Sequence, residues 1–269
     1  MHKLFKKSLL LPELRGDEQL DLDSPSTIDL HRRIIRQKAF LHRLYADFYA
    51  NLLKPLQAPE SRVSASKIIV ELGSGAGFLK DLEPLVVTSD IVPAPGCDVV
   101  LDAAHLPFKL RSVDAFIMLN VLHHLPSPAS FFGEAENALK PGGKIILIEP
   151  ANSLWARLIY SYLHHEPFDS QGGWELDGHG RLTSANVALA WIILIRDKAI
   201  FSQRFPHLKI RVVRYHTPFR YLLSGGLSTR QLVPDALFAP VRLFEKLLGP
   251  LNRYAGLFMT VELEHTAPE

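Results

Sequence analysis

The chain has 269 residues, of which 47% are hydrophobic and 22% are charged. This composition is typical of a globular protein with a large core and excludes an intrinsically disordered chain. The formal net charge of +2 gives no basic footprint, so we expect no nucleic-acid partner.

Neither a disulfide framework nor a membrane-spanning helix is expected. Cys97 is the single cysteine, so no internal disulfide can form, and a reducing, cytoplasmic location is predicted. The most apolar run, residues 187–195, is about half as long as the roughly 20 residues that a spanning helix needs. The basic amino terminus, with Lys3, Lys6 and Lys7, leaves open a weak peripheral contact with acidic lipid, beside the alternative of an ordinary basic tail.

Residues 1–58 are predicted to form an arm and one long amphipathic helix. Ser26 is placed to cap this helix, and apolar residues recur at helical spacing as far as Leu52. We expect the helix to pack on the core, and covering the cofactor opening is the alternative role. A linker from Pro59 to Ser66 leads into the rest of the chain.

Residues 59–269 are predicted to form one α/β domain. Between residues 67 and 150, short apolar strands alternate with helical stretches, which is typical of a doubly wound parallel sheet. Residues 151–207 are expected to be a helical lid insertion, and residues 208–269 to add further strands and helices. Strands are predicted at residues 67–72, 85–90, 98–101, 113–119, 143–149, 208–215 and 257–265. The predicted helices include residues 77–81, 130–139, 155–165, 184–205, 219–223, 228–232 and 240–248.

Polar residues end five successive strands of this sheet. Doubly wound sheets bind ligands at the carboxyl ends of their strands, beside the switch in strand order. These side chains are therefore expected to face one crevice: Glu71, Asp90, Asp102, Asn120 and Glu149.

A glycine turn follows the first strand of the sheet. Gly73, Gly75 and Gly77 permit positive φ and leave no Cβ in the way of a ligand. A dinucleotide fingerprint counted from Gly73 requires glycine or alanine at position 78, where this chain has Phe78. Glu71 would repel a pyrophosphate and suit a cationic ligand, so the turn indicates a ligand other than NAD.

The strand ends suit a ligand that has a sulfonium, an amino-acid end, a ribose and an adenine. Asp90 can accept hydrogen bonds from both ribose hydroxyls, because a carboxylate offers two acceptor oxygens. Asp102, followed by the small residue Ala103, can accept from an adenine amino group. Asn120 is expected to meet the amino-acid end.

Five blocks of the sequence, in order, resemble the class I S-adenosylmethionine-dependent methyltransferases. They are ELGSGAG at 71–77, TSD at 88–90, LDAAHLPF at 101–108, VDAFIMLNVLHHL at 113–125 and LKPGGKIILIEP at 139–150. The resemblance implies a Rossmann-like, seven-stranded α/β sheet with an antiparallel final hairpin, and S-adenosyl-L-methionine as the cofactor. The cofactor-binding residues that we expect are Glu71, Gly73, Ser74, Gly75, Gly77, Asp90, Ile91, Asp102, Ala103 and Asn120.

Histidines beside the fourth strand are the candidates for acid–base chemistry. His123 and His124 follow Asn120, and histidine titrates near neutral pH, so either is a candidate catalytic base if the acceptor must lose a proton. His165, Glu166 and Trp174 in the insertion are candidate substrate residues. We expect no metal, because adjacent histidines rarely converge on one ion.

The resemblance is greatest to the branch that methylates small molecules and lipid- or glycan-linked intermediates. It implies a methyltransferase that acts at oxygen in preference to nitrogen. An apolar C-terminal third, including Phe244 and Leu247 beside Arg242 and Lys246, leaves room for a hydrophobic acceptor or a membrane surface. The alternatives are a non-catalytic module that binds S-adenosylmethionine and an NAD-dependent oxidoreductase.

Overall fold

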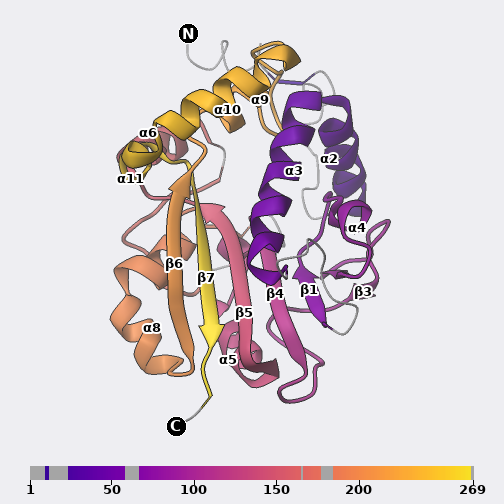
Figure 1. The fold of residues 1–269 in the computed structure, drawn as a ribbon, viewed down its shortest axis with the longest axis vertical. Helices are drawn as coiled ribbons and strands as arrows, with labels where there is room; N and C mark the ends of the chain where they lie inside the picture. Colours follow the sequence, from indigo (N-terminus) through magenta and orange to yellow (C-terminus); the bar gives the residue numbers. More distant parts are fainter. Residues whose placement is uncertain (1–9, 12–23, 58–66, 165, 177–183, 268–269) are drawn as a thin grey trace.

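A seven-stranded sheet lies at the centre of the computed structural model, which describes residues 10–11, 24–57, 67–164, 166–176 and 184–267 (Figure 1). The strand order is β3-β2-β1-β4-β5-β7-β6, and β7 runs antiparallel to both of its neighbours. This architecture confirms the predicted doubly wound sheet with a final antiparallel hairpin. The strands are β1 (Ile69–Leu72), β2 (Val87–Asp90), β3 (Val99–Val100), β4 (Val113–Leu119), β5 (Leu139–Pro150), β6 (Leu208–His216) and β7 (Phe258–His265).

Helices cover both faces of the sheet. In Figure 1, α2 and α3 lie together on one side, while α6, α10 and α11 gather above the ends of β6 and β7. The α-helices are α2 (Pro25–Gln37), α3 (Ala39–Leu53), α4 (Leu79–Leu82), α5 (Pro128–Ala138), α6 (Leu154–Tyr162), α7 (Leu189–Trp191), α8 (Lys198–Arg204), α9 (Arg220–Ser224), α10 (Phe238–Leu247) and α11 (Asn252–Ala255). Tighter or wider turns are η2 (Lys54–Leu56), η3 (Leu122–His124), η4 (Ile192–Arg196), η5 (Asp235–Leu237) and η6 (Gly249–Leu251).

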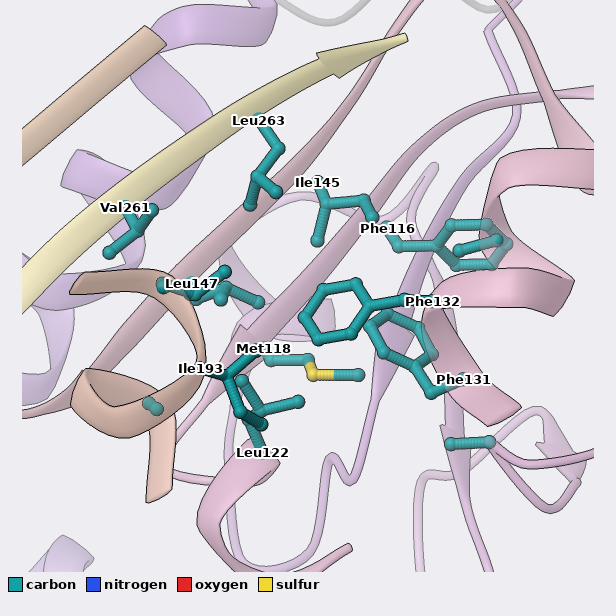
Figure 2. Close-up of a cluster of buried hydrophobic side chains, with 14 of the residues drawn as sticks. Phe116, Met118, Leu122, Phe131, Phe132, Ile145, Leu147, Ile193, Val261 and Leu263 are labelled. Carbon is teal, nitrogen blue, oxygen red and sulfur yellow. The ribbon is translucent and has the colours of Figure 1, made fainter. Parts of the chain in front are cut away.

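Two apolar cores form because successive side chains of a strand point to opposite faces of the sheet. Ile117 and Ile146 face the core that includes α2, α3 and α6. The opposite core contains residues of α5, η4 and α8 (Figure 2). Its labelled members are Phe116, Met118, Leu122, Phe131, Phe132, Ile145, Leu147, Ile193, Val261 and Leu263.

The pairing of the central strands brings the functional side chains to one edge of the sheet. Glu71 pairs with Thr88 of β2 and with Ile117 of β4. Because β1, β2 and β4 run parallel, the segments that follow them leave the sheet at the same end. The order of the strands switches between β1 and β4, which is where such sheets place their ligands.

The predicted N-terminal helix is broken at Lys38. This residue has extended backbone angles, φ −98° and ψ 92°, between α2 and α3. Its ammonium group donates to the carbonyl oxygens of Gly226 at 2.5 Å and Thr229 at 2.8 Å, a pair of contacts remote in sequence. The cap also differs from the prediction: Ser24 caps α2 and accepts a hydrogen bond from the N–H of Ser26.

The predicted insertion divides into two parts with different surroundings. Its first part carries α6 and Glu166 near the end of β5. The predicted helix over residues 184–205 is instead split into α7, a π-helical turn η4 and α8, with Asp197 at the break. Residues of this second part are buried against the sheet, so they form a structural layer and do not cover the crevice.

Two further predictions need correction. Residues 228–232 were predicted to be helical, but Thr229 forms an isolated β-bridge with Leu10. The stretch 140–143, predicted to end a helix outside the sheet, belongs to β5, where the pairing with β4 is irregular. Among the described residues, no helix is long and apolar enough to cross a membrane.

A buried ion-pair network ties three helices together. Arg220 of α9 donates through Nε to Glu245 of α10 at 2.5 Å and through a terminal nitrogen to Asp47 of α3 at 2.5 Å. The second oxygen of Glu245 accepts the backbone N–H groups of Phe219 and Arg220, both at 2.8 Å. This network fixes α10 relative to the N-terminal helices.

Candidate active site

The glycine turn is held between the ends of β2 and β4. Gly73 and Gly75 have φ values of 67° and 45°, which glycine adopts without strain. The N–H of Gly75 donates to Oδ2 of Asp90 at 2.9 Å. A Cβ at Gly73 would lie 2.6 Å from Cγ2 of Val121, so the segment after β4 packs directly on the turn.

A pocket lies beside this turn. Ser74 is fixed in it because its N–H donates to the carbonyl oxygen of Ser89 at 2.8 Å. Arg32 of α2 also reaches the pocket, so the N-terminal helix supplies one of its walls. The lining residues are Arg32, Glu71, Ser74, Gly75, Gly77, Leu79, Lys80, Thr88, Pro95, Gly96 and Cys97.

Two buried oxygen atoms at the strand ends accept no hydrogen bond from any described residue. One is Oε2 of Glu71 and the other is Oδ1 of Asn120. Burial raises the pKa of Glu71 to about 7; a hydrogen bond from Ser74 opposes the shift and the charge of Asp90 adds to it. Asn120 adopts a left-handed conformation with φ 57°, which directs the chain sharply out of β4. Buried oxygens normally have partners, so both atoms fit a ligand with hydrogen-bond donors.

The aspartates after β2 and β3 differ in exposure. Asp90 is 3% exposed, and its Oδ1 lies 3.3 Å from the N–H of Val92. Ile91 follows it and is half exposed. Asp102 lies at the exposed rim, where its Oδ1 accepts the N–H of Ala104 at 2.8 Å, while Ala103 is buried.

A cluster of histidines and carboxylates lies just past Asn120. His123, which is 3% exposed, directs Nδ1 to Oε2 of the fully buried Glu149 at 2.6 Å. The other oxygen of Glu149 accepts the N–H groups of Val121 and Leu122, both at 2.8 Å. Glu149 on β5 therefore fixes the whole turn after β4.

Glu166 completes this cluster from the insertion. Its oxygens lie 3.6 Å from Nε2 of His123, 3.7 Å from Nε2 of His124 and 3.8 Å from Nδ1 of His164. The rings of His123 and His124 are neighbours, with centroids 4.1 Å apart. The insertion is thus joined to the turn after β4 by charge and not by packing alone.

The charges in this cluster shift the pKa of two of its members. Burial lowers the pKa of His123, but the charges and hydrogen bonds of Glu149 and Glu166 outweigh burial and raise it to about 10. Burial raises the pKa of Glu166, but the neighbouring histidines, His123 first, hold it well below its usual range. A histidine that keeps its proton at neutral pH cannot accept another, so this shift argues against the predicted role of His123 as a general base.

Comparison with known families decides what this crevice binds. Residues 71–147 match the family described as "Methyltransferase domain". The chain contains a class I S-adenosylmethionine-dependent methyltransferase domain. Its cofactor is S-adenosyl-L-methionine, and the NAD-dependent and non-catalytic alternatives are no longer needed.

Solved structures with the same fold are distant in sequence. A geranyl diphosphate methyltransferase in complex with SAM has a TM-score of 0.53 and 15% identity, over 96% of this chain and 96% of that chain. Geranyl diphosphate C-methyltransferase from Streptomyces coelicolor A3(2) has a TM-score of 0.49 and 13% identity, over 96% and 89%. A possible histamine N-methyltransferase from Thermotoga maritima has a TM-score of 0.49 and 16% identity, over 88% and 99%. A comparison with curated proteins finds no match.

The residues of the methyltransferase fit its cofactor. The unpartnered oxygens of Glu71 and Asn120 suit the cationic amino group of S-adenosylmethionine, because a carboxylate and an amide oxygen both accept hydrogen bonds. The positive φ of Gly75 lets the backbone pass close to a ligand. Asp90 meets this turn from β2, where the ribose was expected.

The predicted substrate residues do not all meet in the methyltransferase crevice. Glu166 joins His123 and His124, whereas His165 lies outside the described residues. Trp174 packs in the core layer: its indole N–H donates to Asp197 at 2.8 Å. Glu149 was predicted to face the crevice but was assigned no role, because no local pattern shows that a carboxylate pairs with a histidine of another strand.

Proposed function

We propose that the methyltransferase transfers a methyl group to an oxygen atom of a small molecule or of a lipid- or sugar-linked intermediate, in the cytoplasm. The observation that carries this proposal is the position of the cluster formed by His123, His124 and Glu166. It follows the strand that ends at Asn120 and adjoins Val121, which packs on the glycine turn. A polar acceptor held there would lie beside the donor.

The division of labour within the crevice follows from its chemistry. S-adenosylmethionine supplies an activated methyl group when it is bound. Glu71 and Asn120 would hold its amino-acid end, Asp90 its ribose, and Asp102 with Ala103 its adenine. Holding the acceptor in line with the donor contributes much of the catalysis, because orientation alone is worth about 7–11 kcal/mol.

The acceptor end of the crevice is polar and shielded. The side chains of His124 and Glu166 are 11% and 15% exposed. A hydroxyl group could donate a hydrogen bond to Glu166 while its oxygen faces the donor. His124 is then the histidine that remains as a candidate base, since His123 is engaged by two carboxylates.

An exposed apolar face supports an acceptor that is itself apolar or bound to a membrane. It is formed by α6, α10 and α11, which lie together in Figure 1. Cationic side chains of Arg157, Arg242, Lys246 and Arg253 are exposed on the same helices, a charge pattern that suits anionic lipid. The exposed apolar residues are Leu154, Leu158, Tyr162, Leu243, Phe244, Leu247, Leu251 and Tyr254.

Methyl transfer from labelled S-adenosylmethionine tests the acceptor atom. The full chain is incubated with phenols, long-chain alcohols and glycolipids, each paired with an analogue in which an amino group replaces the hydroxyl. We expect the label in the hydroxyl compounds and S-adenosylhomocysteine in equal amount. Label found in the amines instead would refute transfer to oxygen, and no binding of S-adenosylmethionine would refute the enzyme itself.

A further inference from the structure

We infer that His123, His124 and Glu166 form a binding site for a divalent transition metal ion of the zinc class. Each of the three offers one ligand atom, and these atoms all lie within 4.8 Å of one another. The sequence alone predicted no metal, because neighbouring histidines rarely converge on one ion. Here they do converge, since a carboxylate from the insertion faces both.

The distances in the cluster match ligands of a shared ion better than direct hydrogen bonds. Nε2 of His123 and Nε2 of His124 lie 3.6 Å and 3.7 Å from the oxygens of Glu166. An N–H···O hydrogen bond spans about 2.7–3.2 Å. Two ligands of a tetrahedral ion with bonds of about 2.1 Å are about 3.4 Å apart. The three atoms therefore need only small shifts to bind a common ion.

The second nitrogen of His123 is already fixed in the way that metal sites require. Nδ1 of His123 lies 2.6 Å from Oε2 of Glu149. A metal-binding histidine typically donates its other ring N–H to a carboxylate, which sets the tautomer and leaves the far nitrogen for the ion. Glu149 is itself fixed by the N–H groups of Val121 and Leu122, so the imidazole of His123 is oriented before any ion arrives.

The local backbone places the other two ligands. The turn η3 sets His123 and His124 side by side, and the N–H of Asn186 donates to the carbonyl oxygen of His123 at 3.0 Å. The N–H of Glu166 donates to Nδ1 of His164 at 3.2 Å. His164 therefore acts as a positioning residue for the carboxylate and not as a fourth ligand.

The set of donors indicates the class of ion and its use. Two imidazoles and one carboxylate suit zinc, and three protein ligands leave one position open, as in catalytic zinc sites. Resting on the proposed function, an ion here would act as a Lewis acid on the acceptor hydroxyl and lower its pKa. The hydroxyl proton leaves to solvent, its oxygen takes the methyl group, and the carbon–sulfur bond of the donor breaks to give S-adenosylhomocysteine.

Titration of the metal-free full chain with Zn²⁺ tests the site. The chain is stripped with a chelator, and binding is followed by calorimetry and by metal analysis after dialysis. We expect one ion per chain, and at least 100-fold weaker binding in both His124→Ala and Glu166→Gln. Glu149→Gln should weaken binding about 10–100-fold by releasing the orientation of His123. His207→Ala, at the start of β6, is the matched histidine control and should bind as the wild type does.

The outcomes separate this inference from the proposed function. Absence of stoichiometric Zn²⁺ binding, or binding unchanged in His124→Ala and Glu166→Gln, would overturn the metal site. Binding of S-adenosylmethionine, measured on the same samples, shows that each variant is folded and that the cofactor half is intact. A chain that binds Zn²⁺ but methylates only amines would retain the metal site and lose the proposed acceptor atom.

Discussion

The carboxyl group of Glu71 is buried at the end of β1 and has a pKa of about 7, above its ordinary value of 4.5. Between these two pH values the folded, cofactor-free chain holds a proton that the unfolded chain has lost. The stability of the folded chain therefore falls as pH rises through this window. Binding a cation requires the opposite, because only the ionised carboxylate attracts it.

We therefore expect the affinity for S-adenosylmethionine to rise with pH. From about pH 6 to about pH 8 the ionised fraction of a group with a pKa near 7 grows roughly tenfold, and the affinity should follow. Calorimetric titration across this range measures the effect. Glu71→Gln removes the titrating group and reveals any contribution from the ligand's own amino group. An equal pH dependence in the variant would rule out Glu71 as the cause.

Asp90 offers a second test at the same scale. Asp90→Ala should weaken S-adenosylmethionine binding about 10–150-fold, since a hydrogen bond to a charged group is worth about 1.5–3 kcal/mol. Asp102→Ala is the matched variant, and it should have a smaller effect because Asp102 lies at the exposed rim. Wild-type affinity in Asp90→Ala, with an unchanged circular dichroism spectrum, would refute its ribose role.

At the scale of the elements, α10 depends on the buried network around Arg220. Glu245→Ala removes the carboxylate that accepts from Arg220 and from two backbone N–H groups. Removing one partner of a buried ion pair costs about 3–5 kcal/mol, because the other charge is left unpaired. Urea unfolding should show this loss of stability.

The exposed pair of Arg211 and Glu264 is the control for this measurement. Their side chains are 50% and 33% exposed, at 3.0 Å. Arg211→Ala should change the unfolding free energy by less than about 1 kcal/mol, as exposed ion pairs usually do. Equal effects of the two substitutions would show that the network around Arg220 contributes no more than a surface pair.

Elements that depend on local pattern were predictable from the sequence, and those that depend on distant contacts were not. Apolar runs and the glycine turn identify β1, β2 and β4, because the signal lies within each segment. The break at Lys38 is set by carbonyl groups near residue 226, and the pairing of His123 with Glu149 joins two strands. The cofactor half was accordingly predicted better than the acceptor half, whose parts meet only after folding.

At the scale of the whole molecule, the two ends of the sheet differ in character. The carboxyl ends of β4 and β5 adjoin the polar cluster. The helices α6, α10 and α11 present apolar side chains beside cations, and the network around Arg220 holds α10 in place. An acceptor drawn from a membrane would thus meet an apolar surface on the molecule that also carries the polar crevice.

Vesicle flotation tests whether this surface meets a membrane. We expect the full chain to float with anionic vesicles more than with zwitterionic ones, and less at high ionic strength, because salt screens the attraction of the cations. Phe244→Glu together with Leu247→Glu should reduce partitioning at least tenfold, since burying each such apolar side chain is worth about 1.5–3 kcal/mol. Leu110→Glu, which changes an equally exposed leucine before β4, should partition as the wild type does. If all three proteins partition alike, the face of α10 has no role in membrane contact, and the acceptor must reach the crevice from solution.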